Sequence, residues 1–178
     1  FAYNDEINSI IFDSSITRIE SFSFQGCTKI TQITIPYSVT SIGKYAFESC
    51  LLKQITIPSS VTSIEDYAFN LCSSLTQISI PSSVTSLGKG VFRGCSLKQI
   101  SIPSSITSLE NELFQYCPLT QITIPSSVTS IGEYVFYGSL LTDITIPTSV
   151  TSIGIGAFNL CYNLVQILIP SSVTSIRD

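Results

Sequence analysis

The sequence predicts an all-β solenoid, in which short repeats of the chain stack as successive turns. Seven prolines recur at intervals of 22 or 23 positions, and seven phenylalanines recur in step with them. Short segments between them alternate polar and apolar residues, which is typical of half-buried strands. No stretch has the length or periodicity of a covering helix. The prolines are Pro36, Pro58, Pro81, Pro103, Pro125, Pro147 and Pro170, and the phenylalanines are Phe24, Phe47, Phe69, Phe92, Phe114, Phe136 and Phe158.

Each unit begins with a short strand. Residues 54–57 read Gln-Ile-Thr-Ile, and Pro58 follows where a ladder N–H is no longer needed. We expect these first strands to stack into one parallel sheet with irregular backbone on the other side. A second segment, residues 61–64 and its copies, suits a short extended or bent conformation.

The unit ends in a turn and a loop. Residues 67–69 and their copies predict a tight turn or a single 3₁₀ turn, and the recurring Gly43, Gly88, Gly132 and Gly154 are interpreted as turn glycines. The count from the first strand isoleucine to the phenylalanine is always 14, whereas the count onward to the next strand is 8 or 9. An extra residue inside a strand would turn its side chains to the other face. The variation therefore predicts a loop after Cys27 and its copies.

The repeats account for the whole chain as one domain. A unit this short cannot bury its own apolar side chains, so each unit must stack on its neighbours. We expect residues 1–178 to form a single solenoid of about eight units, with a repeat period of 22–23.

Composition excludes several functions. The chain has no His, so it has no imidazole base for a Ser-His-Asp triad or a Cys-His dyad. A net charge of −4 argues against binding to nucleic acid or an anionic membrane. No apolar run reaches the ~18 residues of a membrane span. The acidic pairs Asp5–Glu6 and Glu110–Glu112 are interpreted as solvated charges, and we expect no enzyme activity and no cofactor.

One unit reads L-T-Q-I-S-I-P from Leu75, then V-T-S-L, and ends in V-F-R-G-C at Cys95. With this pattern the chain resembles the BspA-like class of leucine-rich repeats, and the resemblance covers practically the entire sequence. It implies a right-handed superhelix with one parallel sheet and turn or 3₁₀ segments on the convex side. The departures are modest, with Ser139 in place of the cysteine and Asp13 in place of the proline.

The repeat register also bears on the two ends of the chain. Residues 1–4 match the phenylalanine-to-cysteine part of a unit, and residues 171–177 match the start of one. We therefore expect the chain to be a fragment of a longer array. Unpaired apolar rows at the ends predict end-to-end homo-oligomers.

The six cysteines follow the repeat. Cys27, Cys50, Cys72, Cys95 and Cys117 lie 22 or 23 positions apart, and Cys161 follows after two units. One shared position favours buried free thiols that act as small hydrophobes. Disulfides between adjacent units and, less so, a metal site remain alternatives.

The outward side of the first strands is the candidate binding surface. Its two rows carry amides and hydroxyls with almost no charge, and solenoids present such extended faces to partners. The alternative is that these side chains only hydrogen-bond to one another along the stack. Ile11 and Leu168 place apolar side chains on this otherwise polar face. They either contact neighbouring units at the ends of the array or are departures from the repeat that contact a partner. The candidate partner-binding residues are Gln32, Thr34, Tyr37, Lys53, Gln54, Thr56, Gln77, Lys98, Gln99, Gln121 and Asp143.

By resemblance, the expected function is non-enzymatic protein binding, in cell adhesion or ligand recognition at the cell surface or outside the cell. The expected partner is an extracellular matrix, host or other cell-surface protein, or a glycan. One alternative is a cytoplasmic leucine-rich repeat scaffold or regulator, for example of a protein phosphatase. A structural or ice-binding rod, suggested by the Thr and Ser row, is a second alternative.

Overall fold

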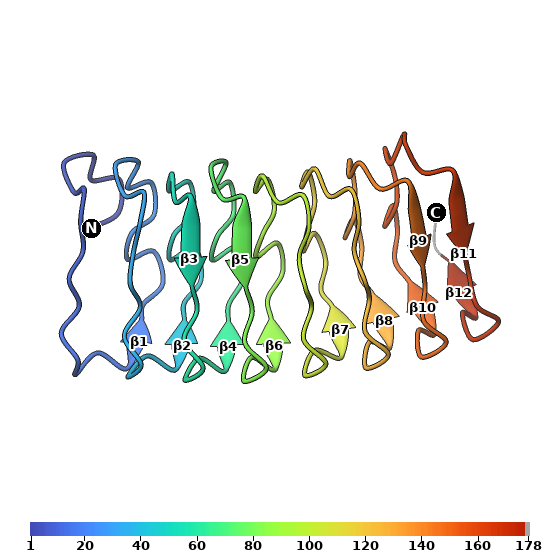
Figure 1. Ribbon diagram of the computed structural model, residues 1–178, viewed down its shortest axis with the longest axis horizontal. Coiled ribbons are helices and arrows are strands. Elements are labelled where there is room, and N and C mark those ends of the chain that lie inside the picture. The colour runs from blue at the N-terminus through green and yellow to red at the C-terminus, as the bar shows by residue number, and fades with distance from the viewer. Residues whose placement is uncertain (177–178) are drawn as a thin grey trace.

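The computed structural model describes residues 1–176 as a β-solenoid, which confirms the predicted fold class (Figure 1). The end of the partial unit expected at 171–177 lies outside the described residues. The described residues form strands, turns and loops and no helix. The strands are β1 (Arg18–Ile19), β2 (Ser41–Ile42), β3 (Gln54–Thr56), β4 (Ser63–Ile64), β5 (Gln77–Ser79), β6 (Ser86–Leu87), β7 (Ser108–Leu109), β8 (Ser130–Ile131), β9 (Asp143–Thr145), β10 (Ser152–Ile153), β11 (Gln166–Leu168) and β12 (Ser175–Ile176).

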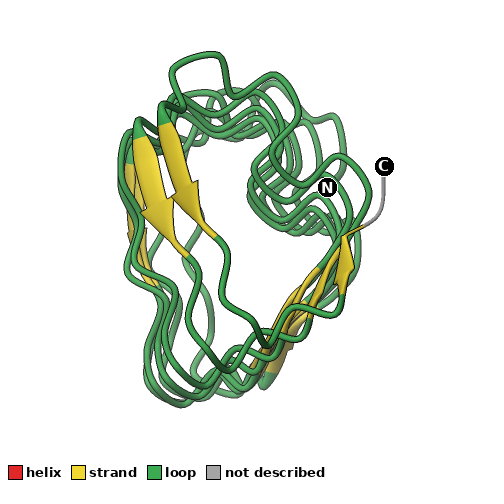
Figure 2. Ribbon diagram, turned by 90° about the vertical axis from the view of Figure 1, so that its right-hand side faces the viewer, coloured by secondary structure: helices red, strands yellow, loops and turns green. Residues whose placement is uncertain are grey.

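Two kinds of strand ladder run along the solenoid, on different sides of its cross-section (Figure 2). The second segments of the units form two four-stranded parallel sheets, β1-β2-β4-β6 and β7-β8-β10-β12. Hydroxyls just before these strands support them: Ser83 donates to the carbonyl of Val61 at 2.7 Å, and Thr85 donates to that of Thr62 at 3.4 Å. The sequence predicted only a bent or extended segment here, and missed this ladder.

The first strands form a less continuous ladder than the single sheet that we expected. β3 pairs with β5 and β9 pairs with β11, while Thr34–Thr56 and Ser101–Thr123 form isolated bridges. From residue 32 onward, full pairing occurs only across the longer steps, 54 to 77 and 143 to 166. The steps from 77 to 99, from 99 to 121 and from 121 to 143 are each one position shorter. The step from 9 to 32 has the longer loop and no pairing, so the longer loop accompanies full pairing only from residue 32 onward.

The phenylalanines form a continuous stacked column inside the solenoid. Ring centroids of neighbouring units lie 5.4–6.0 Å apart from Phe24 to Phe158. Phe47, Phe69, Phe92, Phe114 and Phe136 are fully buried. Such offset stacking adds to the hydrophobic gain of burying each ring, so each unit stabilises the next.

Residues with a left-handed backbone conformation lie on both sides of each phenylalanine in the sequence. The residues two before and two after each phenylalanine have positive φ, as at Tyr67 (56°) and Leu71 (56°) around Phe69. The N–H groups of these three residues donate to the next unit, to Lys89, Val91 and Arg93 carbonyls at 2.7–3.0 Å. The turns of neighbouring units are therefore joined by backbone hydrogen bonds, as the strands of a ladder are. The positive φ costs about 1–2 kcal/mol at a residue with a side chain.

The recurring glycines have a different role from the one predicted. Gly43 and Gly154 lack positive φ, but an added Cβ would lie 2.6 Å from a backbone nitrogen of the preceding unit. They are needed for the close approach of two units rather than for a turn. Glycines with positive φ lie beside the phenylalanines instead, as at Gly90 and Gly94.

The cysteines stack as predicted, and the structure pairs none of them in a disulfide. Five are buried, and Cys161 is half-buried. Each thiol donates to the carbonyl of the phenylalanine one unit earlier, as Cys95 does to Phe69 at 3.1 Å. In the unit that carries Ser139 in place of the cysteine, the serine hydroxyl lies 3.2 Å from the Cys161 sulfur.

The interpretation of Glu112 as a solvated charge is wrong. Its side chain is only 21 % exposed and lies 3.0 Å from Lys89 Nζ and 3.7 Å from Arg93 Nε. The Tyr67 hydroxyl donates to its carboxylate at 3.1 Å. Its partners come from the two preceding units, because Glu112 occupies a position of positive φ beside the phenylalanine column. Glu110 is exposed, as expected.

Cys95→Ser should lower the free energy of unfolding by about 1–3 kcal/mol, because a hydroxyl replaces a thiol at a fully buried site. Chemical denaturation measures this change. The reverse substitution, Ser139→Cys, restores the repeat and should not destabilise the protein. An unchanged midpoint for Cys95→Ser would contradict the burial of this position.

Stability should fall as the pH rises above about 9. Burial raises the pKa of the Cys50 and Cys117 thiols from 9.0 to about 12, and those of Cys72 and Cys95 well above 9.0. The folded state holds these protons more tightly, so the stabilisation is complete below pH 9 and is lost as the pH rises toward the folded pKa. Each thiol contributes a slope of about 1.4 kcal/mol per pH unit.

Denaturation midpoints measured between pH 8 and 10 test this expectation. Cys95→Ser removes one titrating thiol and should reduce the slope of the unfolding free energy against pH. A midpoint that stays constant over this range would show that the thiols are not buried in the folded state.

Candidate functional site: a groove in the strand face

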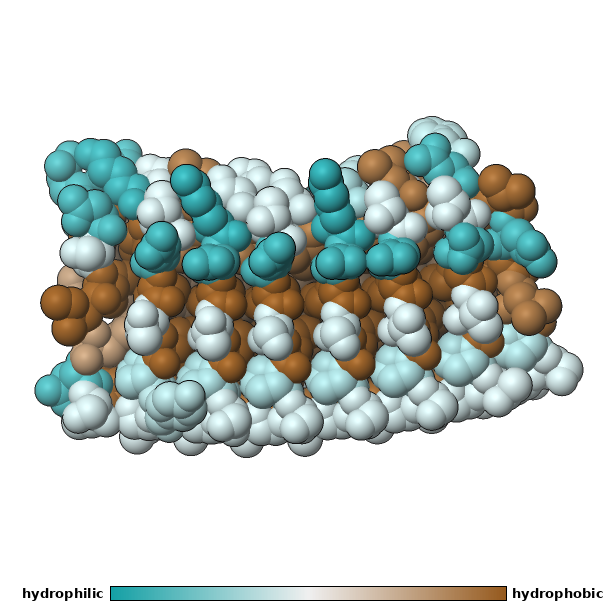
Figure 3. Space-filling model, in the orientation of Figure 1, coloured by the Kyte–Doolittle hydropathy of each residue, from teal (hydrophilic) through white to brown (hydrophobic). Residues whose placement is uncertain are grey.

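The outward rows of the first strands form the strand face, defined here by residues 32–34 and their copies through 166–168. Every predicted binding residue is exposed, including Tyr37 at 78 %. Ile11 and Leu168 also point outward, 96 % and 61 % exposed. Figure 3 shows rows of polar side chains crossing this face with apolar surface between them.

The polar side chains of the strand face are largely available to a partner. Within residues 1–176, one amide-to-amide bond joins the row, from Gln121 Nε2 to Gln99 Oε1 at 3.1 Å. The strand hydroxyls, such as those of Thr56 and Thr123, donate to no described residue. The alternative, that these polar side chains only hydrogen-bond to one another along the stack, therefore holds for Gln99 and Gln121 and not for the rest of the face.

A groove of about 800 Å³ crosses the strand face where the first-strand ladder is interrupted. Its floor contains Ile78 and Ile122, which are half-buried, whereas their copies Ile55 and Ile144 are 5 % and 4 % exposed. Ile100 also lines the groove but is only 8 % exposed, so the apolar floor is open mainly at Ile78 and Ile122. The lining residues are Gln77, Ile78, Gln99, Ile100, Ser101, Gln121, Ile122, Thr123, Ile124, Asp143, Ile144, Thr145 and Pro147.

The groove contains only part of the predicted site. Gln77, Gln99, Gln121 and Asp143 line it. The remaining predicted residues are exposed outside it; they are Gln32, Thr34, Tyr37, Lys53, Gln54, Thr56 and Lys98.

Sequence reasoning placed the groove's hydroxyls on the outward face but did not include them among the candidate binding residues, and it missed the isoleucine floor. The hydroxyls of Ser101, Thr123 and Thr145 follow the repeat and so drew no attention as departures. The only signal for the groove was unit length, since three consecutive shorter steps cross it.

The groove's chemistry is that of recognition. Asp143 is its one charged lining residue, and its carboxylate accepts a hydrogen bond from the Thr142 hydroxyl at 3.0 Å. Amides and hydroxyls above an apolar floor can orient a ligand by hydrogen bonds while burying its apolar surface. Residues 1–176 contain no group of three His, Cys, Asp or Glu side chains placed to hold a metal ion. That part of the chain also has no helix able to span a membrane.

Comparison with known protein families agrees with the geometry. A model described as a BspA type leucine rich repeat region matches in six copies, over residues 1–120 and 89–178. The chain belongs to this family. Leucine-rich repeat proteins are interaction modules that are typically non-enzymatic, and a stacked array with an extended face suits that role. Comparison with curated proteins by sequence finds no match.

Solved leucine-rich repeat structures superpose closely on this BspA-type chain. A leucine-rich repeat protein from Bacteroides ovatus matches with a TM-score of 0.83 and 26 % identity, over 97 % of this chain and 57 % of that one. A leucine rich cell surface protein from Faecalibacterium prausnitzii matches with a TM-score of 0.78 and 39 % identity, over 85 % and 42 %. The T. pallidum leucine rich repeat protein matches with a TM-score of 0.72 and 26 % identity, over 84 % and 72 %. The chain thus spans about half the length of the first two.

Proposed function

We propose that this BspA-type repeat array is a non-enzymatic recognition module at the cell surface, and that the strand face binds an extracellular matrix, host or other cell-surface protein. The observation that carries the proposal is the groove, where the interrupted ladder exposes Ile78 and Ile122 between two polar rows. The proposed contact residues are the predicted strand-face residues together with the groove hydroxyls.

The chemistry of the face supports a protein partner. A protein interface combines an apolar centre with a polar rim and few charges at its core. The groove has an isoleucine floor, Gln77, Gln99 and Gln121 on one side, and a single carboxylate. The exposed Tyr37, Lys53 and Lys98 extend the face beyond the groove, and an exposed tyrosine is a frequent contact residue.

The cell-surface location is supported by likeness alone. The Faecalibacterium prausnitzii structure, 39 % identical to this chain, is named a cell surface protein. By analogy, we place this chain on the cell surface or outside the cell.

Substitutions in the groove test the proposal. Gln99→Ala with Gln121→Ala removes two amides from its polar row, and Ile122→Asn places an amide in its floor. We expect the triple variant to bind purified fibronectin, laminin or collagen at least tenfold more weakly than the parent chain, about 1.4 kcal/mol or more. Surface plasmon resonance measures the affinity.

A matched control lies on the other ladder. Ser86→Ala with Ser130→Ala alters two outward hydroxyls of β6 and β8 and should leave the affinity unchanged. Tyr37→Ser with Lys53→Thr returns two departures to the repeat, and weaker binding would extend the contact beyond the groove. Equal binding by the groove variant and the parent would refute the strand-face site. Retention of a cytosolic protein without any matrix binding would favour the scaffold alternative.

End-to-end association of copies is a further part of this proposal. In the first and last units, core-row side chains such as Ile10 and Phe158 are only partly buried, and Val165 of the last unit is 91 % exposed. We expect the sedimentation coefficient to rise with concentration and Val165→Lys to suppress the rise. A monomer at millimolar concentration would contradict this expectation.

A further inference from the structure

The second outward position of each first strand forms a row along the strand face, which we call the hydroxyl row. It runs from Ile11 through residues 34, 56, 79, 101, 123 and 145 to Leu168, and it reads Ile, Thr, Thr, Ser, Ser, Thr, Thr, Leu. Ile11 and Leu168 are exposed, so apolar side chains stand at both ends of the row (Figure 3). The row therefore has the same pattern in both directions. A surface of this kind is complementary to a second copy of itself that is turned end for end.

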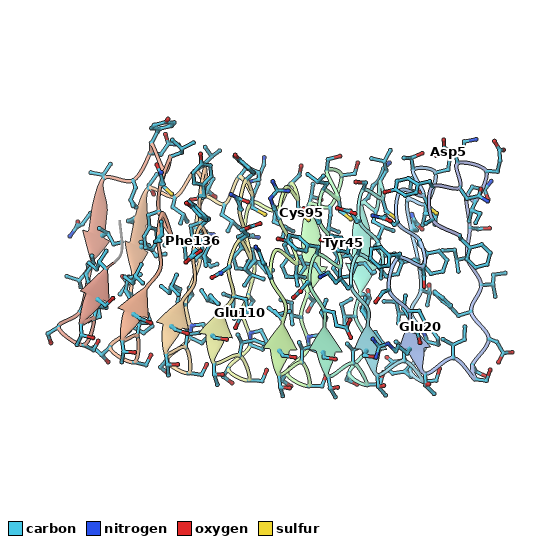
Figure 4. The ribbon with its side chains drawn as sticks, turned by 180° about the vertical axis from the view of Figure 1, so that it is seen from behind. Asp5, Glu20, Tyr45, Cys95, Glu110 and Phe136 are labelled. Atoms are coloured by element: carbon cyan, nitrogen blue, oxygen red, sulfur yellow. The ribbon has the colours of Figure 1, made fainter. Side chains whose placement is uncertain are left out.

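The charged residues at the strand face have no partner in the rest of the described chain. Lys53 and Lys98 beside the face and Asp143 on it are exposed. Within residues 1–176, none of the three forms an ion pair. Away from this face, charged side chains do pair within the chain, as Arg18 does with Glu20 at 3.3 Å (Figure 4). The charges of the strand face are thus available to another molecule.

One rotation of a second copy brings these opposite charges together. A two-fold axis parallel to the strands reverses the order of the units, so the unit of Lys53 lies over the unit of Gln121 in the other copy. Lys53 is then one unit, about 4.8 Å, from Asp143 of the second copy. Lys98 lies over the unit of Gln77, which has no charge on this face. A two-fold axis along the solenoid would place each unit over its own copy and leave Lys53 four units, about 19 Å, from Asp143.

The same rotation also covers the groove. The groove is lined between Gln77 and Pro147, in the half of the face nearer the C-terminus. Gln32 and Gln54 lie in the other half, where they are exposed and line no part of it. The rotation lays Gln54 over Gln121 and Gln32 over Asp143 of the second copy. Each amide both donates and accepts, so it is complementary to another amide or to a carboxylate.

We propose that the partner of the strand face is a second copy of this chain, held antiparallel about a two-fold axis parallel to the strands. This inference rests on the proposed function, because it names the protein that occupies the same face. The contact joins like arrays, with the N-terminal half of each face over the groove of the other. A two-fold contact closes at a dimer, whereas end-to-end contacts can extend further. The face is narrow, so we expect the dimer to be weak and reversible.

Engineered thiols test the orientation of the two copies. Mixing the Thr34→Cys chain with the Thr145→Cys chain should give a disulfide-linked heterodimer on mild oxidation, because these positions oppose each other in the dimer. Neither chain alone should cross-link, since its two engineered thiols lie five units, about 24 Å, apart. Non-reducing electrophoresis measures the products, and the parent chain controls for the native cysteines. Cross-linking of each chain with itself, without the heterodimer, would overturn the antiparallel arrangement.

Charge reversal tests the contact between the copies. Asp143→Lys should weaken the dimer at least tenfold, because the change acts twice in a symmetric dimer. Adding Lys53→Asp to the same chain should restore it. Adding Lys98→Asp instead should not, since Lys98 lies three units, about 14 Å, from Asp143 of the second copy. Sedimentation equilibrium at low salt, where exposed charges are least screened, measures the affinity.

The apolar ends of the hydroxyl row have a test of their own. Ile11→Thr with Leu168→Thr gives both ends the residue that Thr34 and Thr145 provide in other units. We expect at least tenfold weaker dimerisation, and an unchanged thermal midpoint confirms that the variant is folded. Ser86→Ala with Ser130→Ala on the other ladder should leave the dimer unchanged.

The outcomes separate this inference from the proposed function. A chain that remains monomeric at millimolar concentration overturns the second copy as the partner. Association that continues beyond a dimer and is unaffected by Asp143→Lys indicates end-to-end contacts and overturns it too. If the groove variant loses matrix binding in either case, the strand-face site stands with another protein as its partner. A dimer that charge reversal breaks and restores supports the inference whether or not a matrix protein binds.

Discussion

The stacking of identical positions from unit to unit is the constraint on which the rest of the structure depends. In the phenylalanine column, each ring packs on the ring before it and the ring after it, within a core shared by the other buried rows. The thiol of each cysteine donates to the carbonyl of the phenylalanine one unit earlier, and the turn N–H groups donate to the following unit. A core built in this way has interactions almost entirely between nearest neighbours.

That constraint explains why the outer surface can vary while the units remain alike. Buried positions stay apolar in nearly every unit, as Ala46, Val91 and Leu113 do before the phenylalanines, because a polar change would disturb two neighbours at once. Positions that face water are free to depart. Tyr37, Tyr137 and Tyr162 are such departures, and each leaves the buried rows intact. Information about partners is therefore carried by the exceptions to the repeat.

The strand-face groove arises in a different way, from the backbone. Ile78 and Ile122 are standard residues of the repeat, yet they are half-buried whereas their copies Ile55, Ile100 and Ile144 are buried. From residue 32 onward, each interrupted step has a loop shorter by one residue, whereas the step from 9 to 32 is interrupted with the longer loop.

The sequence by itself determined the solenoid, the limits of its units, the burial of the cysteines and the exposure of the strand-face residues. Periodicity carries this information, since a residue that recurs once per unit must occupy the same place in every turn. Tertiary structure alone decided the pairing and the contacts between units. Whether a strand completes its ladder depends on backbone separation across a loop, which periodicity does not encode. Sequence reasoning interpreted Glu112 as a solvated charge, whereas in the structure it has a φ of 60° and its carboxylate lies 3.0 Å from Lys89 Nζ of the preceding unit.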